Sequence, residues 1–185
     1  MKFLKKIFVL LITLVGLVLV IALFVKKDFK VSRSIEINRV ASDVFDYIRY
    51  LKNQESFAVW QSKDPNVEIS YSGAEDGTEG AIYKWDSAVE DVGAGEQEIM
   101  KIDENERIEF ELRFTRPMEM IGQAFFTTEY LGGSSEQKTR ITWGFEGSSP
   151  WPWNISFLFR DMDNELGPEL QEGLDNLKKV LESKD

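Results

Sequence analysis

An uninterrupted apolar run from Ile7 to Val25 constrains this chain more than any other feature of its sequence. A helix needs about 20 apolar residues to cross a bilayer core about 30 Å thick. The run has this length, and lysines lie on both sides of it, within residues 2–6 and at residues 26 and 27. The sequence therefore predicts an N-terminal transmembrane anchor over residues 1–27 and one soluble domain over residues 28–185.

A secretory signal peptide that is cleaved off is the alternative to an anchor. Its apolar core is about 7–15 residues long, and small residues follow at the cleavage site. This run is longer and ends in the bulky Leu23, Phe24 and Val25, so we favour an anchor. Basic residues prefer the cytoplasmic side, but they flank this helix at both ends. The very short N-terminal tail favours a single-pass protein of the cell membrane whose domain lies on the extracytoplasmic side.

The composition of the domain limits its partners and its chemistry. All 32 acidic residues but only 17 of the 22 basic ones follow Lys27, so the domain carries a net charge of −15. This charge opposes binding to nucleic acid and to anionic headgroups, since both are polyanions. The chain has no cysteine and no histidine, which removes thiolate chemistry, the commonest zinc ligand and the usual general base. We therefore expect no metal, no cofactor and no nucleic-acid partner.

Alternation of apolar and polar residues with a period of two predicts seven strands after the anchor. The first strand, over residues 29–39, is followed by two short helical segments. The first of these begins near Ser42 and buries Val44, Phe45 and Ile48. The other six strands are joined by short loops, which predicts an antiparallel meander. They lie at residues 67–71, 81–86, 96–102, 108–115, 118–131 and 139–146.

A leucine stripe predicts a long helix at the end of the chain. Pro168 lies inside the stripe and should kink or split the helix, because proline lacks a backbone donor. A sheet with one apolar face needs a cover, so we expect an α+β fold in which a seven-stranded curved antiparallel sheet is wrapped around the C-terminal helix. The leucines, at steps of three and four, are Leu166, Leu170, Leu174, Leu177 and Leu181.

Three stretches carry a resemblance that covers about residues 29–183. Residues 34–38 followed by residues 41–48 are similar to a first strand running into a helix with the pattern A-x-x-V-F-x-x-I. Residues 139–143 resemble the last strand, and residues 173–182 resemble a helix with the pattern G-L-x-x-L-K-x-x-x-E. In this order they resemble the START/Bet v1-like (SRPBCC) superfamily, specifically its polyketide cyclase/dehydrase-like bacterial branch. The resemblance implies the helix-grip fold and a hydrophobic ligand, whose identity varies among members.

The apolar faces of the strands provide candidate residues for a ligand cavity between sheet and helix. On residues 118–131 the set without charges includes the small Gly122 and Ala124. If the space between sheet and helix is open, we expect it to be widest there, because the neighbouring inward residues are larger. The alternative is that these side chains simply fill the core. The ten candidate ligand-binding residues are Tyr83, Trp85, Phe110, Phe114, Met120, Gly122, Ala124, Phe126, Trp143 and Met162.

Two groups of carboxylates are candidates for catalysis or metal binding. Glu96 and Glu98 lie on a strand without clear parity, and Glu98 could act as an acid or base if it faced the cavity. Asp161, Asp163 and Glu165 resemble a divalent-metal cluster. Residues two apart on a helix point to different sides, so we expect a solvated face there and no metal site.

Residues 148–153, with the sequence SSPWPW, lead into the last helix. In a helix-grip fold this segment would lie near the mouth of the cavity. Two interpretations remain open: an apolar plug over one end of the sheet, or a lip that receives a lipid-like ligand or the membrane surface.

Three functions from different classes fit the sequence. We favour a membrane-anchored binding domain for a hydrophobic small molecule or lipid. The first alternative is a cyclase/dehydrase-like enzyme acting on such a molecule, which the absence of histidine and cysteine disfavours. The second is a structural or protein-interaction module with a filled core. The expected partners are the hydrophobic ligand and, through the N-terminal helix, the membrane.

Overall fold

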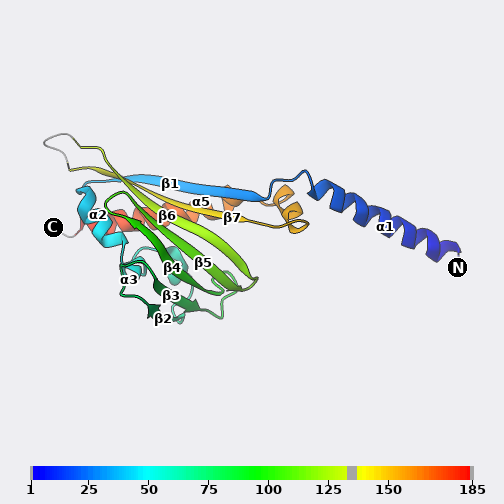
Figure 1. Ribbon diagram of the computed structural model, residues 1–185, viewed down its shortest axis with the longest axis horizontal. Helices are drawn as coiled ribbons and strands as arrows, with labels where there is room; N and C mark the ends of the chain where they lie inside the picture. Colours follow the sequence, from blue (N-terminus) through cyan, green and yellow to red (C-terminus); the bar gives the residue numbers. More distant parts are fainter. Residues whose placement is uncertain (1, 133–136, 184–185) are drawn as a thin grey trace.

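Seven antiparallel strands form one curved sheet in the computed structural model, which describes residues 2–132 and 137–183 (Figure 1). The chain leaves the sheet after its first strand, passes through three short helices and returns as a six-strand meander. The last strand pairs with the first, which gives the order β1-β7-β6-β5-β4-β3-β2. The elements are β1 (Asp28–Ile37), α2 (Ala41–Ile48), α3 (Leu51–Gln54), α4 (Val59–Lys63), β2 (Glu68–Gly73), β3 (Ala81–Asp86), β4 (Ala94–Asp103), β5 (Arg107–Arg116), β6 (Met120–Tyr130) and β7 (Thr139–Ser148).

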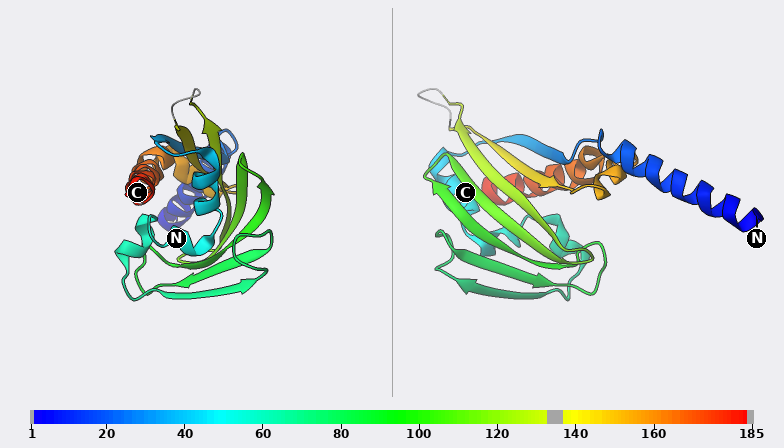
Figure 2. Two further views of the ribbon diagram at one scale, coloured as in Figure 1. Left: turned by 90° about the vertical axis from the view of Figure 1, so that its left-hand side faces the viewer. Right: turned by 45° about the vertical axis from the view of Figure 1, so that its right-hand side comes forward.

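The C-terminal helix α5 (Met162–Glu182) lies on the concave side of the sheet, as the leucine stripe predicts (Figure 2). Leu170, Leu174 and Leu177 are buried in the same core cluster as Phe110 and other inward strand residues. The predicted α+β helix-grip architecture is confirmed. The helix begins after Asp161, whose carboxylate accepts hydrogen bonds from the two backbone N–H groups of residues 163 and 164. It continues through Pro168, so of the two expected effects, a kink or a split, the proline does not produce the split.

A β-bulge explains why the parity of β4 could not be read from the sequence. Ile99 pairs with Phe110 and Lys101 pairs with Glu109, so Met100 is an extra residue between them. The extra residue reverses the inward and outward positions along the strand. Before the bulge, Gln97 faces the concave side with its partner Leu112.

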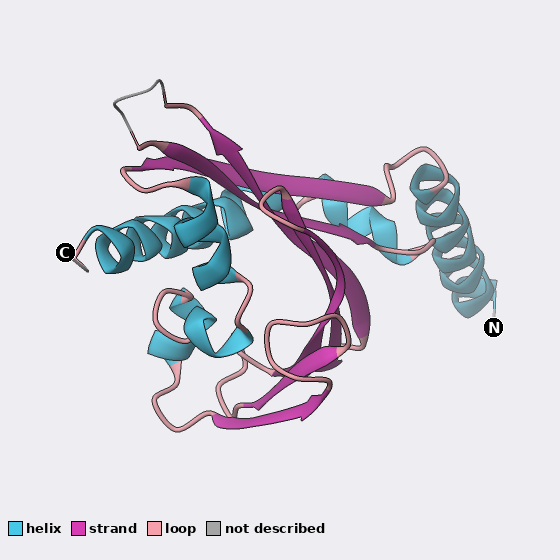
Figure 3. Ribbon diagram, turned by 60° about the vertical axis from the view of Figure 1, so that its left-hand side comes forward, coloured by secondary structure: helices cyan, strands magenta, loops and turns pink. Residues whose placement is uncertain are grey.

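Two groups of helices cover the concave side of the curved sheet (Figure 3). The helix α5 packs mainly along β1, and the short helices α2 to α4 lie beside the other strands. Gly173 lets α5 approach β7, because a Cβ at this position would lie 2.6 Å from the ring of Trp143.

The N-terminal helix α1 (Lys2–Ala22) projects away from the sheet (Figure 1). Among the described residues it is the one helix long and apolar enough to cross a membrane, with a mean hydropathy of 2.6 and none of that stretch buried. Length and composition alone fit a signal sequence as well as an anchor. The division of the chain at residue 27 stays a prediction.

Candidate functional site

The deep half of the concave face is a packed aromatic core. Phe110, Phe126 and Trp143 are buried, and the ring of Phe126 lies 5.0 Å from that of Trp143 and 5.9 Å from that of Phe110, measured between centroids. Phe57, from the segment between α3 and α4, closes this cluster with edge contacts to Phe126 and Trp143. Ala124 is also buried here. Four of the ten candidate residues therefore belong to the hydrophobic core.

The space in front of Gly122 is occupied by an aromatic ring. A Cβ at Gly122 would lie only 2.4 Å from the end of the Phe145 ring. The prediction that the interior is widest at this glycine is therefore wrong, because the small residue seats a neighbour from β7. In the same way, Gly95 leaves room for the ring of Trp85, and Gly147 leaves room for the ring of Phe29.

A continuous row of partly exposed rings crosses the concave face. Successive ring centroids are 5.6 to 6.4 Å apart; three of the contacts are edge-on, two are stacked and one is tilted. The row begins on the edge strand β2 and ends in the short 3-10 helix η1 (Trp153–Leu158). We call it the aromatic row; its members are Tyr71, Tyr83, Trp85, Phe114, Phe145, Phe29 and Phe157.

The aromatic row presents apolar surface that the core does not cover, since all of its rings keep part of their surface exposed. Tyr83, Trp85 and Phe114 were candidates from the sequence. Met120 and Met162, which were also candidates, are partly exposed as well, and Met120 is the cross-strand partner of Phe114. The sequence reasoning missed four members. Phe145 shares the parity of Trp143 and could have been found, whereas Phe29 is in phase with the charged Arg33, which obscures the apolar alternation of β1.

Uncharged polar groups lie beside the β3 and β4 part of the row. The Gln61 amide donates to the hydroxyl oxygen of Tyr83 at 2.7 Å, and the Gln97 amide donates to Oε1 of Gln54 at 3.1 Å. Burial raises the pKa of Tyr83, so its hydroxyl keeps its proton. Nε2 of Gln54 is buried without a hydrogen-bond partner. These groups can bind a neutral oxygen of a ligand whose remaining surface lies against the rings.

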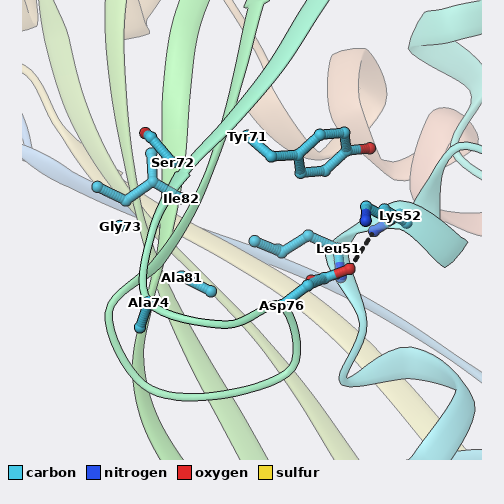
Figure 4. A pocket seen from close by; sticks show the side chains of 9 residues that line it. All are labelled: Leu51, Lys52, Tyr71, Ser72, Gly73, Ala74, Asp76, Ala81 and Ile82. Carbon is cyan, nitrogen blue, oxygen red and sulfur yellow. Dashed lines mark hydrogen bonds between the residues drawn. The ribbon is translucent and has the colours of Figure 1, made fainter.

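A small pocket of about 250 Å³ adjoins the first ring of the row (Figure 4). It lies between α3 and the β2–β3 edge, and its wall includes Tyr71 and Ala81. Asp76 closes one side by accepting hydrogen bonds from the backbone N–H groups of Leu51 and Lys52. Pockets for drug-sized ligands usually measure about 300–1,000 Å³, so this one fits only a small group or one end of a longer molecule.

Comparison with known proteins places the chain in a family. The model of the family "Polyketide cyclase / dehydrase and lipid transport" matches residues 28–182. The chain belongs to this family. A comparison with curated proteins finds no match.

Solved structures share the fold of this family member at low sequence identity. A protein from Mesorhizobium loti has a TM-score of 0.57 and 10% identity, over 85% of this chain and 99% of its own. A hypothetical protein from Helicobacter pylori has a TM-score of 0.57 and 15% identity, over 83% of this chain and 88% of its own. The di-domain ARO/CYC BexL from the BE-7585A biosynthetic pathway has a TM-score of 0.58 and 13% identity, over 85% of this chain and 51% of its own. At these identities the likeness concerns the fold alone.

The carboxylates of the β4 strand in this polyketide cyclase/dehydrase family member lie on the convex face. Glu96 and Glu98 each lie 2.7 Å from the guanidinium of Arg113, which also binds Glu111. Hydrogen bonds from Lys84 and Arg113 hold the pKa of Glu96 below its usual 4.5. An acid–base role of Glu98 inside the cavity is therefore excluded by its position.

The acidic residues at the start of α5 serve the helix and its packing. Asp161 caps the helix, Asp163 binds Arg33 at 2.8 Å, and Glu165 binds Arg160. No group of three or more acidic side chains within the described residues is arranged to hold a metal ion.

The segment that follows β7 in this family member contacts the end of α1. The indole N–H of Trp151 donates to the backbone oxygen of Leu19 at 3.1 Å. The amide of Asn154, a fully buried residue, donates to the backbone oxygens of Ala22 at 2.7 Å and Val25 at 2.9 Å. The SSPWPW sequence therefore leads to the joint between the domain and the N-terminal helix.

Proposed function

We propose that this chain is a membrane-anchored binding domain for a hydrophobic small molecule or lipid, which it holds against the aromatic row on the concave face. The observation that carries the proposal is the row itself. A domain with a filled interior and no ligand would be expected to cover such rings, because exposed apolar surface is unfavourable in water. The family's description, which names polyketide cyclases and lipid transport, is consistent with an apolar ligand.

The polar groups beside the row indicate the chemistry of the ligand. The Tyr83 hydroxyl and the Gln54 amide are uncharged hydrogen-bond groups. Two cations near this face are paired, Arg33 with Asp163 and Lys63 with Glu169. A third, Lys52, lies 5.2 Å from the centroid of the Tyr71 ring, whose hydroxyl donates to the carboxylate of Glu55. An apolar molecule with a neutral hydroxyl or carbonyl oxygen fits these groups better than a molecule with an anionic headgroup.

The joint between α1 and η1 supports an anchor rather than a cleaved signal. Removing residues 1–27 would leave the buried amide of Asn154 without the carbonyl oxygens of Ala22 and Val25. These hydrogen bonds support the proposal that the helix stays in the mature protein. The proposed location is the cell membrane, with the domain on the extracytoplasmic side, because the lysines within residues 2–6 favour a cytoplasmic position for that end of the helix.

Dye binding to residues 28–185 tests the ligand site. The neutral apolar dye N-phenyl-1-naphthylamine should bind saturably and gain fluorescence. Trp85→Leu should weaken binding by roughly threefold to tenfold, because one aromatic contact is lost. The matched control is Phe125→Leu, which removes a ring from the convex face, where it packs on Gly144. Equal binding by both variants, or no saturable binding, would contradict the proposal and favour a module with a filled core.

A cyclase/dehydrase-like enzyme is the second candidate. It rests on the family's description and on the fold shared with BexL. The titratable groups that this site offers along the row for proton transfer include the hydroxyls of Tyr83 and Tyr71, whose pKa values are both raised by burial, and the Glu55 carboxylate that accepts a hydrogen bond from Tyr71. Mass spectrometry of organic extracts from the purified domain separates the two candidates: an unaltered lipid indicates a binding protein, and a mixture of precursor and cyclised product indicates an enzyme.

A further inference from the structure

Four large apolar side chains are exposed together where the chain passes from β7 to α5. Trp151 lies two residues before the first residue of η1, which is Trp153. Leu158 is the last residue of η1, and Phe159 follows it. Their exposed fractions are 43%, 71%, 54% and 86%, respectively. We call these four residues the apolar patch. A soluble surface seldom concentrates such residues in so short a segment unless the segment meets an apolar partner.

The depth of the apolar patch follows from its hydrogen bonds to α1. The apolar run of residues 7–25 has about the length needed to cross a bilayer core, and it ends where Lys26 and Lys27 follow. In a membrane-spanning chain these lysines lie among the headgroups, so the C-terminal end of α1 and the residues just after it lie close to the boundary between hydrocarbon and headgroups. Trp151 donates to Leu19 and Asn154 to Ala22 at that end of the helix, which places η1 at the same level.

The charge of the domain indicates which kind of interaction could bring η1 into contact with the bilayer. The domain carries −15, so attraction to anionic lipids does not draw it onto a membrane. Two tryptophans at the boundary are typical of membrane proteins, because the indole ring is apolar with one polar N–H. Contact with the bilayer would therefore come from apolar insertion of η1 and not from electrostatics.

We propose that the apolar patch inserts into the same bilayer that α1 crosses and holds the domain against it in a fixed orientation. The inference rests on the proposed anchor and deepens the proposed function, because it names the source of the ligand. Phe157 of η1 lies 5.7 Å from Phe29, centroid to centroid, and Phe29 continues the aromatic row. A neutral lipid leaving the bilayer at η1 would meet the end of the row directly.

Quenching of tryptophan fluorescence by brominated lipid tests the insertion. The full-length protein is reconstituted into vesicles of phosphatidylcholine brominated near the headgroup end of its acyl chains. We expect part of the emission to be quenched, and the quenching to persist in high salt. The double variant Trp151→Phe/Trp153→Phe should lose this quenching, and adding Phe159→Trp should restore it. Trp60→Phe is the control and should keep it, because Trp60 packs on Trp143 inside the domain.

Flotation of the vesicles and dye binding separate the possible failures. A protein that floats with the vesicles but shows no quenching, or the same quenching in the double variant, overturns the insertion and leaves the anchor intact. A protein that does not float overturns both the anchor and the insertion. Loss of dye binding by the Trp85→Leu variant is measured independently and decides only the ligand site.

Discussion

At the scale of single residues, glycines decide where the aromatic rings lie. Gly122, Gly95 and Gly147 each face a ring from a neighbouring strand at a distance that a Cβ would violate. The close approach fixes the position of each ring over the sheet. Three rings of the aromatic row, Phe145, Trp85 and Phe29, therefore rest directly on the backbone of the sheet.

Gly122→Ala should destabilise residues 28–185 by about 1–3 kcal/mol, because the added methyl group would lie 2.4 Å from the Phe145 ring. Urea unfolding monitored by circular dichroism measures the effect. The second substitution Phe145→Leu should relieve the clash, so the double variant should be less destabilised than the sum of the single ones. Strictly additive effects would show that the ring does not rest on this glycine.

Arg113→Met should destabilise the fold at neutral pH by about 1–2 kcal/mol, because it leaves three partly buried carboxylates close together. The pKa of Glu96 is lowered in the folded state, so its ion pairs stabilise the fold above about pH 4.5 and lose this effect as the pH falls through the lowered pKa. Stability measured from pH 7 to pH 3 should converge for wild type and variant. Arg140→Met, at a more exposed pair, is the control and should show a smaller difference.

At the scale of elements, α5 provides the cover that the sheet needs. Leu174→Ala should cost about 2–5 kcal/mol, because Leu174 is fully buried between the helix and the sheet. The control is Glu172→Ala, which lies two residues before Leu174 on the exposed side of the same helix and should change stability little. Thermal melts of the two variants compare them directly. Similar melting temperatures would show that α5 does not complete the core.

The elements could be predicted from the sequence where a single period holds. Strict alternation around Ile108 and Phe110 gave the strand and its buried face, and the leucine stripe gave α5. The extra residue Met100 broke the alternation of β4, so the side of Glu98 could not be predicted. The site was harder to predict from the sequence than the elements. The sequence does not show that the ring of Phe145, from another strand, fills the space in front of Gly122.

At the scale of the whole molecule, we expect α1 to retain the protein in membranes. Full-length protein should stay in the membrane fraction after carbonate extraction, because α1 is apolar along its length. A chain beginning at Asp28 should be soluble, because its net charge of −15 opposes association. Recovery of a shortened form of the full-length protein in the soluble fraction would instead indicate a cleaved signal.

The short connection after α1 sets how far the domain can travel. Only residues 23–27 separate α1 from β1, and a fully extended stretch of that length spans at most about 18 Å. With α1 held in a bilayer, the domain stays within this distance of it even when every contact of η1 is broken. An anchored domain with this short reach cannot carry a ligand to a distant membrane. If the domain binds a ligand as proposed, the molecules that deliver or take up that ligand must come to the membrane in which α1 is anchored.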